Sequence, residues 1–292
     1  MTDYDTFIRE LERELGIFLS KEYTFTFTEN TRLNGVRVHT VNIRKNNSNI
    51  SPCVHLDYFY EQYGCGRDIT DIAKSITEII NMQPSFSKTV PDISWERVQD
   101  FIIFSLINYD ANPEMISRLP HIRLFDLALI FRIDAAFMDF EGFINVNHAL
   151  LKVLGKDINE LLTQARKNMN RLMPVRIIKM SEMLGYDDDM FDSDMLICTN
   201  SEKSYGAAGI LYDELPGHLE YSKEHDYFVI PSSIHEVLLL KCEDFKAENG
   251  ELEEIVHAVN QSEAVSASDY LSDSVYRLSE FREEFESLLP VK

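Results

Sequence analysis

Glycine and proline are scarce in this sequence, with 11 Gly and 9 Pro among 292 residues. That content is too low for a collagen-like chain or a Gly/Pro-rich disordered one. The 45% of hydrophobic and 11% of aromatic residues are typical of a folded globular protein, and a chain of this length can bury a core without disulfide or metal cross-links. The composition therefore excludes the fibrous, disordered and small disulfide-rich classes.

Cysteine and long apolar runs are also scarce. The cysteines, Cys53, Cys65, Cys198 and Cys242, form no C-x-x-C pair, and the first residues, MTDYDTFIRE, carry acids where a signal peptide needs a basic start and an apolar run. The run from Leu124 to Phe131 is far shorter than the roughly 20 residues that span a bilayer. We therefore expect reduced thiols, a cytoplasmic location and no membrane contact.

Basic residues are outnumbered, since 28 Lys and Arg stand against 49 Asp and Glu for a net charge of −21. A charge of this sign repels phosphate backbones, so nucleic acid is disfavoured as a partner. The charge is uneven: residues 1–150 carry −7, residues 151–180 carry +5 and residues 181–292 carry −19. A basic segment inside an acidic chain indicates a contact that uses this charge.

The basic segment holds a candidate interaction surface, which consists of Arg166, Lys167, Arg171, Arg176 and Lys179, with Lys152 and Lys156 earlier in the segment. These side chains could bind an external anion or nucleic acid. They could instead pair with acids of residues 181–292 in the same chain or in a second copy, although an exposed pair contributes only ~0–1 kcal/mol. We favour pairing within or between copies of this chain.

Hydrophobic periodicity predicts the elements of the N-terminal part. They are a helix over 2–20, a β-hairpin over 23–43 that turns at Asn34-Gly35, a strand over 53–56, a helical stretch over 57–63 and a helix over 69–82 capped by Asp68. The stretch 83–94, which contains prolines and serines, is the candidate junction. We therefore divide the chain into residues 1–90 and 91–292 and expect the two parts to share a core.

The C-terminal part is predicted from the same patterns, with 95–106 ambiguous between helix and strand. The other elements are a strand over 124–133 that pairs with 140–146, two helices over 150–183 broken near Pro174, strands over 195–199, 206–212, 227–231, 237–240 and 275–278, helices over 215–224 and 252–260, and an acidic tail from Glu280. Strands and helices do not alternate as a doubly wound fold requires. The expected fold class is α+β, with a mixed or antiparallel sheet and flanking helices.

Three strings begin like cofactor or metal motifs and fail. Gly64-Cys65-Gly66 has Ile69 in place of the third glycine of a dinucleotide fingerprint. Gly206-Ala-Ala-Gly209 lacks the Lys-Ser/Thr of a phosphate loop, and its small residues indicate close packing in a strand. His235-Glu236 has Leu239 where a zinc protease has its second histidine. The sequence therefore predicts no cofactor and no metal site.

The string Pro231-Ser-Ser-Ile-His-Glu236 has the highest density of reactive side chains. In an extended segment Ser233 and His235 point to the same face, so a hydroxyl and an imidazole could converge, with Glu236 or Asp126 orienting the ring. Side chains two residues apart are poorly placed for proton transfer, however. We favour a turn in which the serine hydroxyls bind backbone N–H groups before the next strand.

Asp126 lies inside the apolar run Leu124 to Phe131. A carboxylate buried there alone would cost several kcal/mol, so it must either lie at the start of the strand or accept hydrogen bonds from a partner. His121 and backbone N–H groups are the candidate donors. We favour a capped strand entry over a functional acid that shares a pocket with Ser233 or His235.

Several strings together resemble a known family. They are Ser48 to Pro52, Asp57 to Tyr63, Pro120 to Ile122 with Phe125 to Leu127, Pro231 to Val237 and Leu271 to Tyr276. With them the chain, from about residue 30 to residue 278, resembles an uncharacterised bacterial family of unknown function, found mainly in anaerobic Gram-positive bacteria. The resemblance implies one bacterial intracellular module and no particular activity, cofactor or catalytic residue.

These observations favour a binding protein over an enzyme. The leading hypothesis is a soluble intracellular binding or regulatory module without catalysis or cofactor, which contacts a protein partner or a second copy. The alternatives are a hydrolase built on Ser233 and His235, and an acidic mimic of nucleic acid that uses residues 181–292.

Overall fold

The computed structural model describes residues 3–46, 51, 53–82, 93–138, 141–185, 195–222, 225–231, 233–244, 250–261 and 265–289. Most of the predicted junction over 83–94 lies outside these residues. The chain divides into two compact units, Met1–Pro91 and Asp92–Lys292. None of the described helices is long and apolar enough to cross a membrane.

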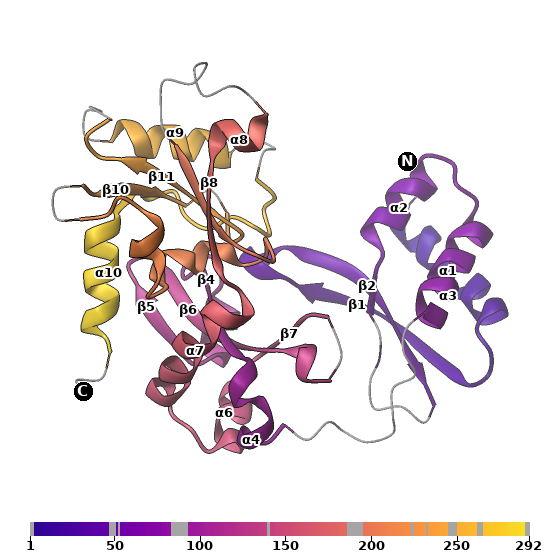
Figure 1. The fold of residues 1–292 in the computed structure, drawn as a ribbon. Helices are drawn as coiled ribbons and strands as arrows, with labels where there is room; N and C mark the ends of the chain where they lie inside the picture. The colour runs from indigo at the N-terminus through magenta and orange to yellow at the C-terminus, as the bar shows by residue number, and fades with distance from the viewer. Residues whose placement is uncertain are drawn as a thin grey trace. The chain divides into compact units, whose positions relative to one another are not determined.

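Unit 1 combines helices with one antiparallel sheet, in the order β1-β2-β3 (Figure 1). Its elements are α1 (Tyr4–Phe18), β1 (Tyr23–Thr31), the 3-10 helix η1 (Leu33–Gly35), β2 (Arg37–Lys45), β3 (Cys53–His55), α2 (Asp57–Gly64) and α3 (Ile69–Met82). The hairpin turns at Asn34 and Gly35, whose φ angles of 59° and 70° lie in the left-handed region that Asn and Gly tolerate. The predicted elements of this part are confirmed.

The core of unit 1 lies between its helices and its sheet. Apolar residues recur every three or four positions in α1, where Phe7, Leu11 and Leu15 are completely buried. They join the buried stripe of α3 and the inward side chains of β2, including Val41 and Ile43, in one cluster. Burial of each large side chain contributes about 1.5–3 kcal/mol, so unit 1 has its own source of stability.

Unit 2 contains the remaining elements. They are α4 (Trp95–Val98), η2 (Gln99–Phe101), β4 (Ile102–Asn108), α5 (Pro113–Arg118), β5 (His121–Leu124), β6 (Leu127–Asp134), η3 (Ala135–Met138), β7 (Phe143–Asn145), α6 (His148–Leu154), α7 (Ile158–Leu172), β8 (Val175–Lys179), α8 (Met180–Leu184), β9 (Leu196–Asn200), η5 (Gly206–Leu211), η6 (Leu215–His218), β10 (Tyr227–Ile230), β11 (Val237–Lys241), α9 (Glu251–Asn260), β12 (Tyr276–Arg277) and α10 (Leu278–Ser287).

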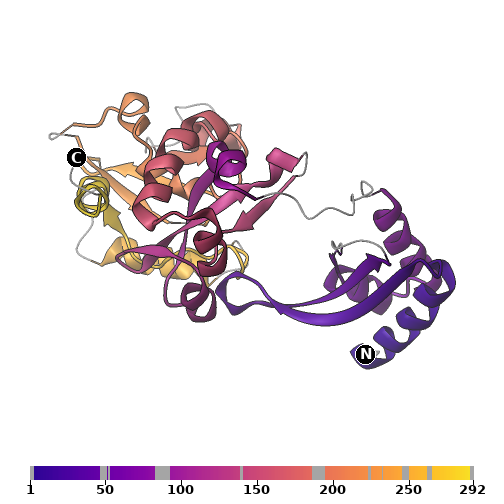
Figure 2. The same ribbon diagram turned by 90° about the horizontal axis from the view of Figure 1, so that it is seen from below.

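The strands of unit 2 form two sheets in the described residues, one ordered β12-β10-β11-β9-β8 and one ordered β4-β6-β5 with β7 paired to β6. Every described pair is antiparallel, which confirms the α+β class. Strand β4 is buried along its whole length because α7 and η5 pack against it. Figure 1 shows α9 along the five-stranded sheet, and Figure 2 shows α10 end-on beside the strands of that sheet.

Three predictions between residues 150 and 224 are wrong. After Pro174 the chain forms β8 and the short helix α8 rather than a second long helix, because Pro174 stops α7 and the β-branched Val175, Ile177 and Ile178 favour a strand. The predicted helix over 215–224 is only the single turn η6.

The predicted strand over 206–212 is also wrong. It is the 3-10 helix η5, which is buried from Gly206 to Leu211. A Cβ at Gly206 would lie 2.4 Å from Thr199 Oγ1, so the close packing expected for this string is present, in a helical turn rather than a strand.

The predicted acidic tail from Glu280 is part of helix α10. Leu278, Phe281 and Phe285 are buried, at spacings of three and four residues, while the glutamates occupy the other face. The apolar stripe was readable in the sequence, but the count of acids concealed it.

Candidate functional site

The Ser233 hydroxyl is part of a turn before β11. It accepts hydrogen bonds from the backbone N–H groups of His235 at 3.0 Å and Glu236 at 3.3 Å, and it donates to Glu236 Oε1 at 3.3 Å. Ser233 is 7% exposed. This is the geometry of a serine that satisfies a turn, and its proton points to a carboxylate rather than to an imidazole.

The His235 ring is oriented by other partners. Its Nδ1 accepts a hydrogen bond from the Tyr205 backbone N–H at 3.3 Å, and its Nε2 lies 3.6 Å from Asp269 Oδ1. Because Nδ1 accepts, the ring proton of the neutral form is on Nε2, facing Asp269. The described residues therefore do not assemble a relay in which His235 takes a proton from Ser233.

Buried Arg132 of β6 helps to fix Tyr205, and no motif had marked it. The Arg132 guanidinium lies 3.6 Å from the centre of the Tyr205 ring, and only 4% of Arg132 is exposed. Burial lowers the pKa of Arg132, and the contact with Tyr205 opposes this effect. A desolvated cation–π contact of this kind contributes about 2 kcal/mol, and Tyr205 has a left-handed φ of 53°.

Asp126 lies in the tight turn between β5 and β6, at the entry of the strand, and is bound by a distant segment of the chain. Ser272 donates to Asp126 Oδ2 at 2.6 Å and Ser274 at 3.4 Å, while the Tyr276 hydroxyl donates to Oδ1. Burial first, and then this bond to Asp126, raise the pKa of Tyr276, so the phenol stays protonated as a donor.

The expected donors to Asp126 were therefore wrong. His121 binds the carbonyl of Leu119 at 2.9 Å instead. No hydrogen bond joins Asp126 to Ser233 or His235 in the described part of the chain, so these candidates are not brought together.

The basic segment lies mainly on α7. This helix begins with a capping box, in which the Asp157 carboxylate accepts from the Glu160 N–H at 2.8 Å and the Glu160 carboxylate accepts from the Asp157 N–H at 3.0 Å. Its apolar face packs on β4, so the basic side chains lie at the edge of this contact or in solvent.

Arg166 makes the intramolecular pairing that the charge distribution predicts. Its guanidinium binds Asp213, and Glu286 of α10 at 3.0 Å, and its side chain is 19% exposed. Burial alone would lower the pKa of Arg166, but these two carboxylates raise it above its ordinary value. The pair joins α7 to α10.

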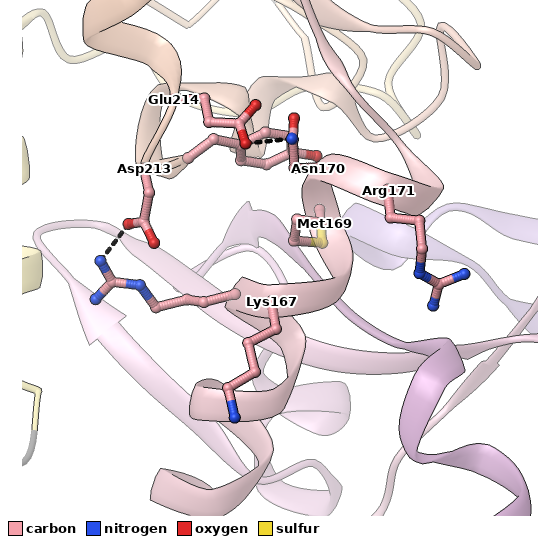
Figure 3. Close-up of a pocket in the computed structure, with 8 residues that line it drawn as sticks. Lys167, Met169, Asn170, Arg171, Asp213 and Glu214 are labelled. Atoms are coloured by element: carbon pink, nitrogen blue, oxygen red, sulfur yellow. Dashed lines mark hydrogen bonds and ion pairs between the residues drawn. The ribbon is translucent and has the colours of Figure 1, made fainter.

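A pocket of about 300 Å³ lies beside this pair, lined by Arg166, Lys167, Met169, Asn170, Arg171, Tyr212, Asp213 and Glu214. Figure 3 shows Glu214 against Asn170, while Lys167 and Arg171 extend away from the carboxylates. Arg171 donates to the carbonyl of Asp100. The pocket wall therefore presents acids beside Arg166 and Arg171, which already have partners, and this disfavours it as an anion site.

The other basic candidates are dispersed. Lys167 and Arg176 make no ion pair with a described residue, and Lys179 lies at the end of β8. Lys156 pairs with Glu160 at 2.8 Å and lies 5.0 Å from the centre of the Trp95 ring. Arg176 and Lys179 thus lie on β8, whereas Arg166, Lys167 and Arg171 lie on α7 and line the pocket.

Reversal of charge at Arg166 is expected to destabilise the protein by about 1–3 kcal/mol, because Arg166→Glu places a third carboxylate against Asp213 and Glu286. Lys167→Glu is the matched control and is expected to change stability by less than about 0.5 kcal/mol. Urea unfolding at low and high salt measures both, and the Arg166→Glu loss should shrink as salt screens the repulsion. Equal losses of stability for the two variants would contradict the pairing of Arg166 with Asp213 and Glu286.

A mainly apolar groove lies between α9 and the five-stranded sheet. It has a volume of about 180 Å³ and is lined by Met195, Ile230, Leu238, Leu240, Leu252, Ile255, Val256, Val259 and Asn260. Leu252 and Val256 are buried against the sheet, whereas Ile255 and Val259 are 50% and 44% exposed. Figure 1 shows α9 lying along β10 and β11 at this place.

Helix α9 is fixed at its far end by polar contacts. Asn260 donates to the Ser272 carbonyl at 2.9 Å and to Asp273 Oδ1 at 2.8 Å, and His257 Nδ1 lies 2.7 Å from Asp273 Oδ2. Burial would raise the pKa of Asp273, but the bonds from Asn260 and His257 lower it, so the carboxylate stays ionised as an acceptor. These contacts therefore fix the position of α9, which forms one wall of the groove.

In the part of the chain that the structure describes, no group of three or more His, Cys, Asp and Glu residues is placed to hold a metal ion.

Comparison with known proteins places the chain in a family. Residues 4–280 match the model of a family described as a family of unknown function, DUF5688. The chain belongs to this family. The match agrees with the resemblance expected from the sequence, and no curated protein or solved structure matches the chain.

In this member of DUF5688, two strings that carried the resemblance are joined by hydrogen bonds, and a third binds the residues just before one of them. Asp126 of the third string binds Ser272 and Tyr276 of the last one, and the Ile234 N–H of the fourth string donates to the carbonyl of Asp269, just before the last string, at 2.8 Å. They therefore mark a structural junction of unit 2 in this chain. The α9 groove was not found from sequence, because its lining comes from separate strands whose apolar residues are typical of any core.

Proposed function

We propose that this DUF5688 member is a bacterial, cytoplasmic protein-binding module without catalysis, and that the α9 groove is its binding site. The observation that carries the proposal is the apolar groove with Ile255 and Val259 exposed at its edge. Exposed apolar surface rimmed by polar residues is typical of protein interaction sites. The free thiols of the described cysteines support the cytoplasmic location.

The size of the groove favours a protein over a cofactor. Small-molecule sites usually occupy about 300–1,000 Å³. The groove volume of about 180 Å³ is nearer to that of the ~150 Å³ cavity that accepts one benzene ring. It therefore fits one large side chain, and such an inserted anchor is how protein partners concentrate binding energy.

The proposal predicts that Ile255→Asp abolishes the capture of the partner from a bacterial lysate. A charge at this half-exposed position opposes an apolar anchor but should cost the fold about 0.5 kcal/mol or less, since Ile255 is on the rim. Affinity capture with quantitative mass spectrometry compares wild type with this variant.

The matched control for this capture is Ile17→Asp. Ile17 is 67% exposed on α1, a helix of unit 1, so the same substitution there leaves the groove unchanged. Proteins that wild type and Ile17→Asp retain and Ile255→Asp loses would support the proposal. An identical set captured by all three would overturn it.

A further inference from the structure

The α9 groove lies beside acids that have no basic partner in the described residues. The first turn of α9 carries Glu251, Glu253 and Glu254, all exposed, and none of them forms an ion pair with a described side chain. Glu251 is one turn before Ile255, on the same side of the helix, and lies about 6 Å from it along the helix axis. The rim of the groove is therefore acidic at the end nearest Glu251.

Several described cations of unit 2 already have partners of their own. Lys241 pairs with Glu220 at 3.0 Å, Arg277 lies 3.7 Å from Asp226, and Arg282 donates to the carbonyls of Ile210 and Tyr212. His257 faces Asp273. These side chains cannot pair with the α9 glutamates without leaving their own partners, and no described cation forms an ion pair with those glutamates.

The acidic charge of the rim also indicates which kind of molecule occupies the groove. A second copy would bring the same three glutamates and a net charge of −21 against the same rim, which is repulsive. A protein segment with Lys or Arg beside an apolar side chain would complement both features. Electrostatic complementarity of this kind steers encounter and sets specificity.

We propose that the groove binds a cationic, amphipathic segment of another protein, which inserts one large apolar side chain beside Ile255 and Val259 and places Lys or Arg against Glu251. The inference rests on the proposed function of the groove and adds the chemistry of its partner. The cation should lie about one helical turn from the anchor, because Glu251 is one turn from Ile255.

A displayed library of random peptides tests this inference on the full chain. Peptides of about 16 residues are long enough to form a helix on binding. They are selected on wild type, with the Ile255→Asp chain used to remove peptides that bind elsewhere. The expected result is enrichment of peptides with positive net charge and with Lys or Arg three or four positions from a large apolar residue.

Binding measurements with single enriched peptides then separate the contribution of the apolar anchor from that of the charge. Ile255→Asp is expected to weaken binding by about tenfold or more, as loss of an anchor pocket does. Glu251→Lys is expected to weaken the binding of cationic peptides several-fold. It should strengthen the binding of otherwise identical peptides in which Glu replaces Lys, and salt should reduce both effects. Glu283→Lys on α10 is the matched charge control and should have a smaller effect.

The outcomes distinguish this inference from the proposed function. Enriched peptides that are neutral or acidic, yet lost with Ile255→Asp, would overturn the cationic partner and leave the groove as a binding site. Absence of any peptide that prefers wild type to Ile255→Asp would overturn both. Sedimentation that shows a dimer of wild type, dissociated by Ile255→Asp, would identify a second copy as the occupant and also overturn the inference.

Discussion

Replacement of Gly206 by alanine is expected to destabilise the protein by about 3 kcal/mol or more. An added Cβ would lie 2.4 Å from Thr199 Oγ1, 2.5 Å from the His235 carbonyl oxygen and 2.8 Å from the Asn200 nitrogen. Two of these atoms belong to the backbone of neighbouring segments, so they cannot move aside as a flexible side chain would. Overpacking of this severity exceeds the usual cost of one inserted methyl group.

The matched control is Gly217→Ala, in the turn η6. A Cβ there would meet no heavy atom within 4 Å, so the expected change is a few tenths of a kcal/mol at most. Urea unfolding followed by circular dichroism measures both variants. Equal midpoints would show that η5 can separate from β9 and that the close packing does not contribute to stability.

Asp126→Leu is expected to cost about 2–4 kcal/mol. The substitution leaves the hydroxyls of Ser272 and Tyr276 without their acceptor, and these residues are 0% and 8% exposed. A buried hydroxyl without a partner costs about 1–3 kcal/mol. Asp126→Asn keeps one carbonyl acceptor, so about 1 kcal/mol is expected for it.

Urea unfolding of Asp126→Asn and Asp126→Leu separates the effect of losing the carboxylate from the effect of changing the size of the side chain. Ser274→Ala serves as a control because the bond of Ser274 to Asp126, at 3.4 Å, is the longest of the three. A Leu variant as stable as wild type would mean that the three donors find other acceptors, and Asp126 would then have no structural role.

The local sequence pattern was sufficient to predict most elements of this fold. The stripe Phe7, Leu11 and Leu15, and the hairpin turn at Asn34-Gly35, depend on residues close in sequence, and both were predicted correctly. The string Gly206 to Leu211 was not, because its conformation is set by contact with β9 rather than by its own periodicity. Pro174 was recognised as an interruption, but the strand that follows it forms only by pairing with β9.

The candidate site was less predictable, for a related reason. The donors to Asp126 are 146 to 150 residues away, so no local spacing could reveal them. Ser233 and His235 lie two residues apart in the sequence, but the orientation of the His235 ring depends on Tyr205 and Asp269. The groove residues Ile255 and Val259 are ordinary members of an apolar helix stripe, and only their exposure in the structure distinguishes them.

The attachment of residues 269–287 has a consequence for how unit 2 folds during synthesis. This segment supplies β12, the donors to Asp126, the carbonyl that accepts from Asn108 across 163 residues, and Glu286, which binds Arg166 across 120 residues. Such a topology has a high contact order, and the loop-closure entropy must be overcome before these contacts form. Until residues 269–287 have been synthesised, the Asp126 turn lacks its hydrogen-bond donors and one edge of β10 is open, so we expect unit 2 to become native only after this segment has been made.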